Sequence, residues 1–242
     1  MWSQDGFATD SLKILKYIKS GGADFQVLLF SATFSDTVRR HAEKLVGPRA
    51  NKVFVPREAL SLDVIKQYRV ECPSQAAKEG VLAKIFPACE RLGQSIVFVR
   101  TRDKARRLHE ALEPLGFVCT SISGGASHAD RDRVIKEFRA GTTKILISTD
   151  VLSRGFDHAA VTLVINFDPP VTQAGAPAFE TYMHRIGRSG RFGRKGAAFN
   201  LVCGDEERRV VDAIATHFAH DIPPVPFDDV DRFEEVLKAA GL

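Results

Sequence analysis

Residues 182–196 carry the pattern of side chains best suited to binding phosphate. They read Y-M-H-R-I-G-R-S-G-R-F-G-R-K-G. On a helix, His184, Arg188 and Arg191 would project from one face, because they are spaced by four and three positions. The glycines make a long helix unfavourable, so we expect one or two turns with a glycine-rich exit. Arginines exposed on such a rigid stub suit bidentate contacts to phosphate, and a solvated basic loop is the alternative.

A second polar group follows an apolar run, in residues 147–157 (I-S-T-D-V-L-S-R-G-F-D). Ligands in open α/β sheets bind at the carboxyl ends of parallel strands. We therefore expect Thr149 to donate to a phosphate and Asp157 to accept from a ribose hydroxyl. The alternative is that Asp157 only caps a turn.

Two further segments have weaker patterns. Residues 29–34 (L-F-S-A-T-F) end a predicted strand with Ser31 and Thr33, whose hydroxyls could bridge to a carboxylate or cap a helix. Residues 97–107 (V-F-V-R-T-R-D-K-A-R-R) lead from a strand into a helix that Thr101 or Asp103 would cap. The basic side chains of this second segment could bind a nucleic-acid backbone, although we expect some of them to be only solvated.

The histidines and cysteines do not predict a metal site. His217 and His220 form H-x-x-H with no third ligand nearby, so we expect surface histidines. The four cysteines (Cys72, Cys89, Cys119 and Cys203) have no C-x-x-C spacing. This disfavours zinc and disulfide frameworks, fits a reducing compartment, and predicts buried, unreactive thiols.

Short apolar runs alternate with amphipathic stretches along the chain. These runs predict the strands and helices that position the candidate residues. Strands are predicted at 26–30, 95–99, 118–123, 144–148 and 161–166, with weaker signals at 64–70 and 197–202. Helices are predicted at 103–115, with Ala105, Leu108, Leu112 and Leu115 on the buried face, and at 127–138. This alternation indicates an α/β fold with a parallel sheet covered on both faces.

An irregular stretch at 49–62, which contains Pro56, interrupts the alternation. We therefore predict that residues 1–58 are the remnant of one α/β domain, 59–66 a linker, and 67–242 a complete second domain. Residues 169–178 are predicted to be a Pro/Gly/Ala loop.

Composition fits a soluble globular protein of one or two domains. The chain has 242 residues, of which 44% are hydrophobic and 26% charged, with a net charge of +4. No apolar run is long enough to span a membrane, and the N-terminus does not resemble a secretory signal.

Taken in order, these segments resemble the DEAD-box RNA helicases over essentially the whole chain. The resemblance is carried by S-A-T (31–33), V-F-V-R-T-R (97–102), S-T-D-V-L-S-R-G-F-D (148–157) and H-R-I-G-R-S-G-R (184–191). The eleven-residue loop 171–181 and the ending V-P-F-D-D-V-D-R-F-E-E-V-L-K resemble the mRNA-export branch that works at the nuclear pore. The translation-initiation branch is the nearest competitor.

The sequence also departs from the family. It contains neither G-x-x-x-x-G-K-[ST] nor D-E-A-D, so the chain looks like the family cut just after its Mg²⁺-binding motif. Ser123-Gly124-Gly125 stands where the family usually has H-G-D, and His128-x-x-Arg131 stands where many members have Q-x-x-R.

The resemblance implies a RecA-like fold and roles for individual residues. ATP and Mg²⁺ are the implied cofactors, with the metal ligands in the missing part of the first domain. Arg188 and Arg191 would be arginine fingers, Asp157 would hold the ribose, and Gly155 would let the backbone approach the nucleotide. Residues expected to couple ATP and RNA are Ser31, Thr33, Arg154, His184 and Arg185. Residues expected to follow RNA phosphates are Thr101, Arg102, Gly124, Arg131 and Thr149.

The implied function is an ATP-dependent RNA helicase that clamps single-stranded RNA and remodels RNA or RNA–protein complexes, with mRNA export as the expected process. The expected partners are single-stranded RNA and nuclear-pore or export-factor regulators. We expect a monomer in the cytoplasm, the nucleus or both. This chain by itself is expected to be inactive as an ATPase. As an isolated chain, the alternative function is a non-catalytic module that binds RNA and nucleotide.

Overall fold

The computed structural model divides the chain into two compact units, Met1–Val55 and Pro56–Leu242. The residues that it describes are 7–22, 25–30, 36–47, 49–53, 64–89, 93–122, 124–125, 127–150, 157–190 and 194–242. The division falls a few residues before the predicted end of the first domain. β1 begins at Ile65, so the last two residues of the predicted linker belong to a strand. That the first unit is part of another RecA-like domain stays a prediction.

In its described residues, the first unit contains α1 (Phe7–Ser20) and α2 (Asp36–Val46). The strand predicted at 26–30 is not formed, and Leu28 and Phe30 are 66% and 91% exposed. The prediction of a buried strand here is wrong for a physical reason. A strand needs a neighbouring strand to satisfy its backbone N–H and C=O groups, and no strand in the described part of this unit supplies one.

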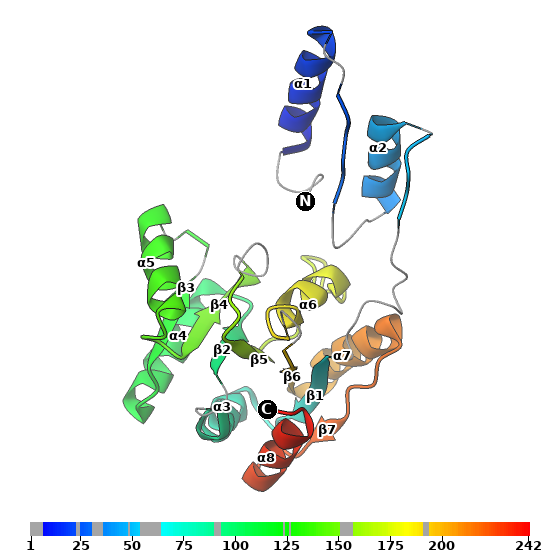
Figure 1. Cartoon of the computed structure of the whole chain (residues 1–242). Helices are drawn as coiled ribbons and strands as arrows, with labels where there is room; N and C mark the ends of the chain where they lie inside the picture. The colour runs from blue at the N-terminus through cyan, green and yellow to red at the C-terminus, as the bar shows by residue number, and fades with distance from the viewer. Residues whose placement is uncertain are drawn as a thin grey trace. The chain divides into compact units, whose positions relative to one another are not determined.

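The second unit is built on a seven-stranded sheet of order β3-β4-β2-β5-β6-β1-β7, in which the neighbouring strands run parallel (Figure 1). The strands are β1 (Ile65–Glu71), β2 (Gln94–Phe98), β3 (Cys119–Ile122), β4 (Ile145–Ser148), β5 (Val161–Asn166), β6 (Gly196–Val202) and β7 (Pro224–Val225). The six strands predicted for this part are therefore confirmed. β7 is a two-residue addition that the sequence did not indicate.

Six helices among the described residues cover the two faces of this sheet. They are α3 (Gln75–Cys89), α4 (Arg102–Leu112), α5 (His128–Arg139), α6 (Phe179–Ile186), α7 (Gly204–Phe218) and α8 (Val230–Ala239). One apolar layer joins α3, α4 and α8 to alternate strand residues such as Val97 and Ile147. The other joins α5, α6 and α7 to the intervening residues, such as Ile96 and Leu146. This alternation is the expected pattern for a sheet buried on both faces, so the predicted fold class is confirmed.

Two details of the helices differ from expectation. The predicted helix at 103–115 breaks into α4 and the short 3₁₀ helix Glu113–Leu115, with Pro114 at the break. Leu115 leaves the buried face as a result and is 59% exposed. α3 was not predicted, because its sequence places Lys78 and Pro87 among the apolar residues.

Candidate functional site

The structure describes nine of the predicted site residues. They are Thr101, Arg102, Gly124, Arg131, Thr149, Asp157, His184, Arg185 and Arg188. The other five predicted site residues, Ser31, Thr33, Arg154, Gly155 and Arg191, lie outside the described residues.

The residues expected to contact RNA gather at the carboxyl edge of β3, β4 and β2, which are neighbours in the sheet. Arg102 follows β2, Gly124 follows β3 and Thr149 follows β4. A Cβ atom at Gly125, which has φ +97°, would lie 2.5 Å from Nη1 of Arg102. The guanidinium therefore packs against a position that only glycine fills easily. This places the loops after β2 and β3 together.

Helix caps position two more of these residues. Oγ1 of Thr101 accepts a hydrogen bond from the backbone N–H of Lys104 at 3.2 Å, so of the two predicted candidates Thr101, and not Asp103, is the N-cap of α4. Arg131 lies near the start of α5, whose cap is Ser127. Nε of Arg131 is buried and has no hydrogen-bond partner among the described residues.

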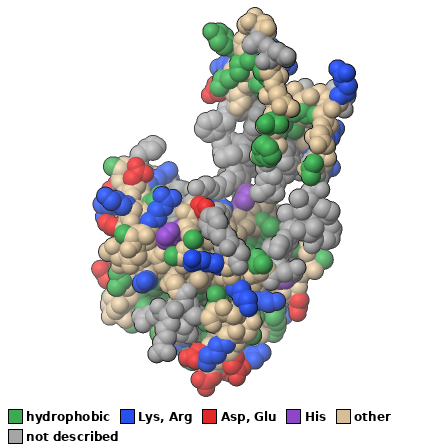
Figure 2. Space-filling view, in the orientation of Figure 1, with side chains coloured by type: hydrophobic (Ala, Val, Ile, Leu, Met, Phe, Trp, Pro, Cys, Tyr) green, Lys and Arg blue, Asp and Glu red, His purple; other side chains and the backbone are tan. Residues whose placement is uncertain are grey.

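Lys and Arg side chains are prominent over α5, whereas acidic side chains gather over α8 (Figure 2).

A buried carboxylate holds the start of α4 in place. Asp168 lies two residues after the end of β5 and is 1% exposed. Its Oδ2 accepts from the backbone N–H of Arg100 at 2.7 Å, and its Oδ1 accepts from Nζ of Lys104 at 2.6 Å. Because these two donors flank Thr101 and Arg102, Asp168 fixes the loop that carries both predicted RNA contacts.

Arg185, which belongs to α6, contacts the same segment that follows β5. Its side chain is 1% exposed and stacks over the Phe98 ring. Nε donates to Oδ1 of Asp150 at 2.6 Å, and Nη1 donates to the backbone carbonyl of Asp168 at 2.8 Å. A buried guanidinium is costly unless it is fully paired, and these contacts offset that cost. Arg185 and Asp168 together therefore connect α6 to the loop after β2.

A chain of buried polar groups continues from Arg185 across the sheet. Nη1 of Arg185 also donates to Asn166, Asn166 donates to Asn200, and Asn200 donates to the Tyr182 hydroxyl. Tyr182 in turn donates to Oε1 of Gln67 at 2.6 Å. Burial raises the pKa of Tyr182, which keeps the hydroxyl protonated as a donor. These bonds fix how α6 is seated on the sheet.

Asp157 and Arg188, the two described residues that are expected to contact the nucleotide, lie at the opposite, amino edge. The segment with Asp157 precedes β5, and the segment with Arg188 precedes β6, which is the neighbour of β5. Nη1 of Arg194 donates to the carbonyl of Ala159 at 3.1 Å and joins the two segments. Thr149 follows β4 and Asp157 precedes β5, so these two residues lie at different edges of the sheet.

Arg188 also differs from expectation. α6 is a helix of two turns that ends before Gly187, as predicted, and Arg188 follows in a turn. Arg188 is only 8% exposed, whereas the sequence predicted an exposed side chain. Its Nε donates to the carbonyl of His184 at 2.9 Å. This contact folds the side chain back along its own helix and fixes the direction of the guanidinium plane.

Asp168 and a buried ion pair nearby were not among the residues predicted from the sequence. Asp168 opens the D-P-P segment after β5, and a charged residue at a strand end was a usable signal. Lys78 of α3 is 0% exposed, and its Nζ donates to Glu207 at 2.6 Å and to the Phe167 carbonyl at 2.8 Å. No local pattern distinguishes such a lysine from a solvated one.

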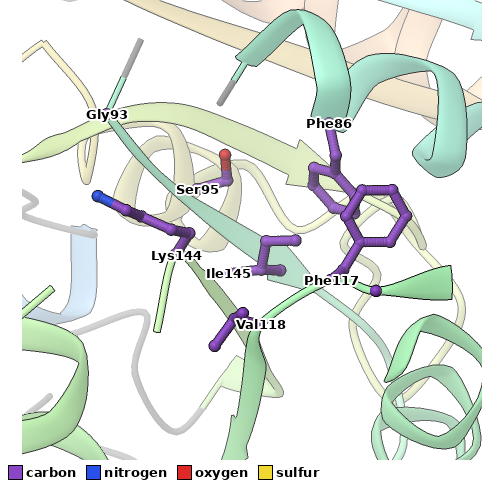
Figure 3. A pocket seen from close by; sticks show the side chains of 8 residues that line it. Phe86, Gly93, Ser95, Phe117, Val118, Lys144 and Ile145 are labelled. Carbon is purple, nitrogen blue, oxygen red and sulfur yellow. The ribbon is translucent and has the colours of Figure 1, made fainter. Parts of the chain in front are cut away.

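Two other features do not belong to this site. A small pocket of about 70 Å³ lies at the amino ends of β2 and β4, lined by residues that include Phe86, Phe117 and Ile145, and none of the predicted site residues lines it (Figure 3). His217 stacks on Phe179 with ring centroids 3.8 Å apart.

Within the described ranges, no three His, Cys, Asp or Glu side chains are placed to hold a metal ion. None of the described helices is both long and apolar enough to cross a membrane.

Comparison with known proteins gives consistent matches. The model of the helicase conserved C-terminal domain matches residues 77–193. DEAD-box ATP-dependent RNA helicase 38 of Oryza sativa subsp. japonica is 45% identical over 246 residues, which cover 100% of this chain and 48% of the relative. The chain therefore spans about half the length of the curated relatives that it matches.

Solved structures agree in both fold and sequence. S. cerevisiae Dbp5 bound to RNA and ADP BeF3 aligns with 99% of this chain and 60% of that chain, at 36% identity and a TM-score of 0.90. The C-terminal domain of the DEAD-box protein Dbp5 aligns with 74% of this chain and 99% of that chain, at 38% identity and a TM-score of 0.68. The RecA-like character of the parallel sheet is thereby confirmed.

Proposed function

This chain belongs to the DEAD-box ATP-dependent RNA helicases, and we propose that it supplies the RNA-binding and arginine-bearing half of one. The protein that carries it would clamp single-stranded RNA and use ATP hydrolysis to remodel RNA or RNA–protein complexes. One observation supports this most directly. Asp168 and Arg185 connect the loop of Thr101 and Arg102 to α6, which leads to Arg188.

On this proposal the carboxyl edge follows the RNA backbone. Thr101, Arg102, Gly124, Arg131 and Thr149 would contact phosphates rather than bases, which gives binding without sequence preference. The side chains at this edge are held in place before RNA arrives, because Asp168 and Arg185 are buried and paired. Less order is then lost on binding.

The amino edge would face the nucleotide. The guanidinium of Arg188 and the exposed carboxylate of Asp157 lie at the same edge. This pair fits ATP, because a guanidinium donates to phosphate oxygens and a carboxylate accepts from ribose hydroxyls. Arg188 and Arg191 would stabilise charge on the transferred phosphoryl group, and Gly155 would let the backbone approach. Bound Mg²⁺ neutralises phosphate charge in this chemistry. We place its ligands outside this sequence, which has neither G-x-x-x-x-G-K-[ST] nor D-E-A-D.

Coupling between the edges would run along α6. His184 and Arg185 lie on this helix, between the carboxyl-edge carboxylate Asp168 and the Arg188 turn. Arg154, Ser31 and Thr33 would complete the coupling and link hydrolysis to closure of the two domains.

Partners and location follow from the branch of the family. S. cerevisiae Dbp5 has been solved bound to Gle1 and to Nup159, and several relatives carry the Dbp5 name. We propose regulators of that kind for this protein, acting in mRNA export at the nuclear pore, with the helicase itself a monomer. A translation-initiation role is the alternative.

The test is RNA-stimulated phosphate release, measured for the complete protein that carries this chain and for the 242-residue chain alone. We expect turnover from the complete protein and none from the chain, which would still bind RNA. Failure of the complete protein to hydrolyse ATP with RNA would contradict the proposed activity. Turnover by the chain alone, with contaminating ATPase excluded, would contradict the assignment of Mg²⁺ ligands elsewhere.

A further inference from the structure

Two cysteines far apart in the sequence are neighbours at the carboxyl ends of β1 and β6. Cys72 directly follows β1 and Cys203 directly follows β6. The two strands pair in parallel, with Glu71 opposite Val202. The backbone N–H of Cys72 donates to the carbonyl of Val202 at 2.7 Å, so the ladder continues and places Cys203 beside Cys72.

Both side chains point to the same face of the sheet. Val70, Leu201 and Cys72 belong to the apolar layer of α3, α4 and α8, whereas Val202 belongs to the opposite layer. Cys203 keeps an extended backbone, with φ −127° and ψ 116°. The alternation along β6 therefore turns Cys203 to the face of Cys72.

The spacing suits a covalent bond between the two sulfurs. Neighbouring strands lie about 4.7–4.9 Å apart, and disulfides join Cα atoms about 4.4–6.8 Å apart. Both thiols are free in the structure. Cys72 is 5% exposed, whereas Cys203 is partly exposed and is the one that a small oxidant can reach.

The two thiols also interact electrostatically, which supports their proximity. The pKa of Cys72 is raised to about 11, first because burial disfavours the thiolate. The nearby Lys78 ammonium opposes this rise, and charge on Cys203 adds to it. Cys72 therefore remains a protonated thiol at neutral pH, so the first reaction with an oxidant is assigned to Cys203, and Cys72 reacts only in the second step.

We propose that Cys72 and Cys203 are a redox modification site, at which a peroxide converts the two thiols into a reversible disulfide. The Cys203 thiolate attacks the peroxide, an S–O bond forms, the O–O bond breaks, and the departing hydroxide takes a proton to become water. The Cys72 sulfur, losing its proton, then attacks the sulfenic acid. The S–S bond forms, the S–O bond breaks, and a second water leaves. Hydrogen peroxide is thereby reduced by two electrons and the dithiol is oxidised.

This site lies at the carboxyl ends of β1 and β6, apart from the strands whose carboxyl ends hold the residues proposed for RNA, and at the sheet edge opposite to that proposed for the nucleotide. β6 and β1 lie on the far side of β5 from β2, β4 and β3. The proposal does not rest on the helicase function, and it replaces the sequence-based expectation that these two thiols are unreactive. Transient disulfides of this kind are compatible with a reducing compartment.

The test treats the reduced chain with hydrogen peroxide and maps its thiols by mass spectrometry without reduction. We expect an intramolecular loss of about 2 Da, for the two hydrogens removed, and a peptide pair that joins Cys72 to Cys203. Dithiothreitol should restore both thiols. Accumulation of sulfinic acid on Cys203 with no cross-linked peptide would overturn the proposal, as would cross-links that form only between chains.

Matched variants make the test specific. Cys203→Ser should abolish the cross-link, and because this residue is partly exposed the variant should fold normally. Cys119→Ser is the control, since Cys119 is also partly buried with a pKa raised to about 11 but lies on β3. It should form the cross-link as well as the parent does, and so should Cys89→Ser. A cross-link that persists in Cys203→Ser or is absent in Cys119→Ser would contradict the assigned pair.

Discussion

The two edges of the sheet in the second unit hold the arginines proposed to be functional in different ways. At the carboxyl edge, the loop of Arg102 is fixed by the buried Asp168 carboxylate, and the backbone carbonyl of Asp168 accepts from Arg185. At the amino edge, Arg188 bonds the carbonyl of His184 in its own helix, and Asp157 is exposed. The carboxyl edge thus depends on charges brought from several strands, whereas at the amino edge a hydrogen bond within the α6 turn helps to direct Arg188.

This difference has a consequence for mutation. Removing a charge at the carboxyl edge leaves other buried groups unpaired, so stability and RNA binding should fall together. Removing a charged side chain at the amino edge should mainly lower the rate of ATP turnover. The two edges can therefore be separated by measuring stability, RNA affinity and phosphate release on the same set of variants.

The largest effect is expected at Arg188. Arg188→Ala in the complete protein should lower RNA-stimulated turnover by about 10³- to 10⁵-fold, because an arginine finger stabilises charge that develops in the transition state. Arg188→Lys should restore little, since a point charge does not reproduce the planar fork. Because Arg188 is 8% exposed, a thermal melt must accompany the assay, which is run well below the midpoint.

Arg194→Ala is the matched control, because Arg194 lies in the same segment and its side chain is exposed. It should keep turnover within a few-fold of the parent. If Arg188→Ala retains more than about a tenth of the turnover, which corresponds to less than about 1.4 kcal/mol of barrier, Arg188 is not the finger.

The second-largest effect is expected on the stability of the fold, when Asp168 is replaced. Asp168→Ala should lower the free energy of unfolding by about 2–3 kcal/mol, because it leaves the Arg100 N–H and the Lys104 ammonium without their acceptor. Urea denaturation measures this change. Asp157→Ala at the amino edge should change stability by less than about 0.5 kcal/mol, since that carboxylate is exposed. Equal losses in the two variants would remove the distinction between the edges.

A smaller effect is expected on RNA binding. The chain should bind single-stranded RNA with a slope of log affinity against log salt of about −2 to −3, as expected for three or four phosphates. Arg102→Ala should make this slope shallower by about 0.7, because the variant neutralises one phosphate fewer. Arg106→Ala is the control on the same helix, where Arg106 pairs with Glu110 at 2.9 Å. Titration of a labelled oligonucleotide at several salt concentrations distinguishes the two, and an unchanged slope in Arg102→Ala would mean that Arg102 is only solvated.

The smallest effect concerns pH and His158 at the amino edge. Nε2 of His158 donates to Oε1 of Gln94 at 2.6 Å, because the Gln94 amide nitrogen already donates to two carbonyls. Burial, and then Arg139, lower the pKa of His158 below 6.5. A histidine with a lowered folded-state pKa stabilises the fold above about pH 6.5, and this contribution is lost as pH falls through the folded value. Unfolding free energies from pH 7.5 to 5 should decline less in His158→Gln, and identical profiles would show that His158 does not contribute.

The sequence by itself determined the strands of the second unit, the start of α4 with a cap at Thr101 or Asp103, the short arginine-bearing helix α6 and the family. These features depend on local patterns, namely the spacing of apolar residues, a capping hydroxyl and glycines that end a helix. The same local signal was insufficient at 26–30, because a strand also needs partners that periodicity does not reveal.

Only the tertiary structure decided which residues are neighbours and which are buried. The order β3-β4-β2-β5-β6-β1-β7 places Cys72 beside Cys203 although β1 and β6 are far apart in the chain. The tertiary structure also buries Lys78, Arg185 and Arg188, although the local sequence around each of them resembles that around a solvated charged residue. The physical reason is that a charge can be buried only where partners from other strands and helices meet it, and strand order, which no local pattern encodes, determines those partners.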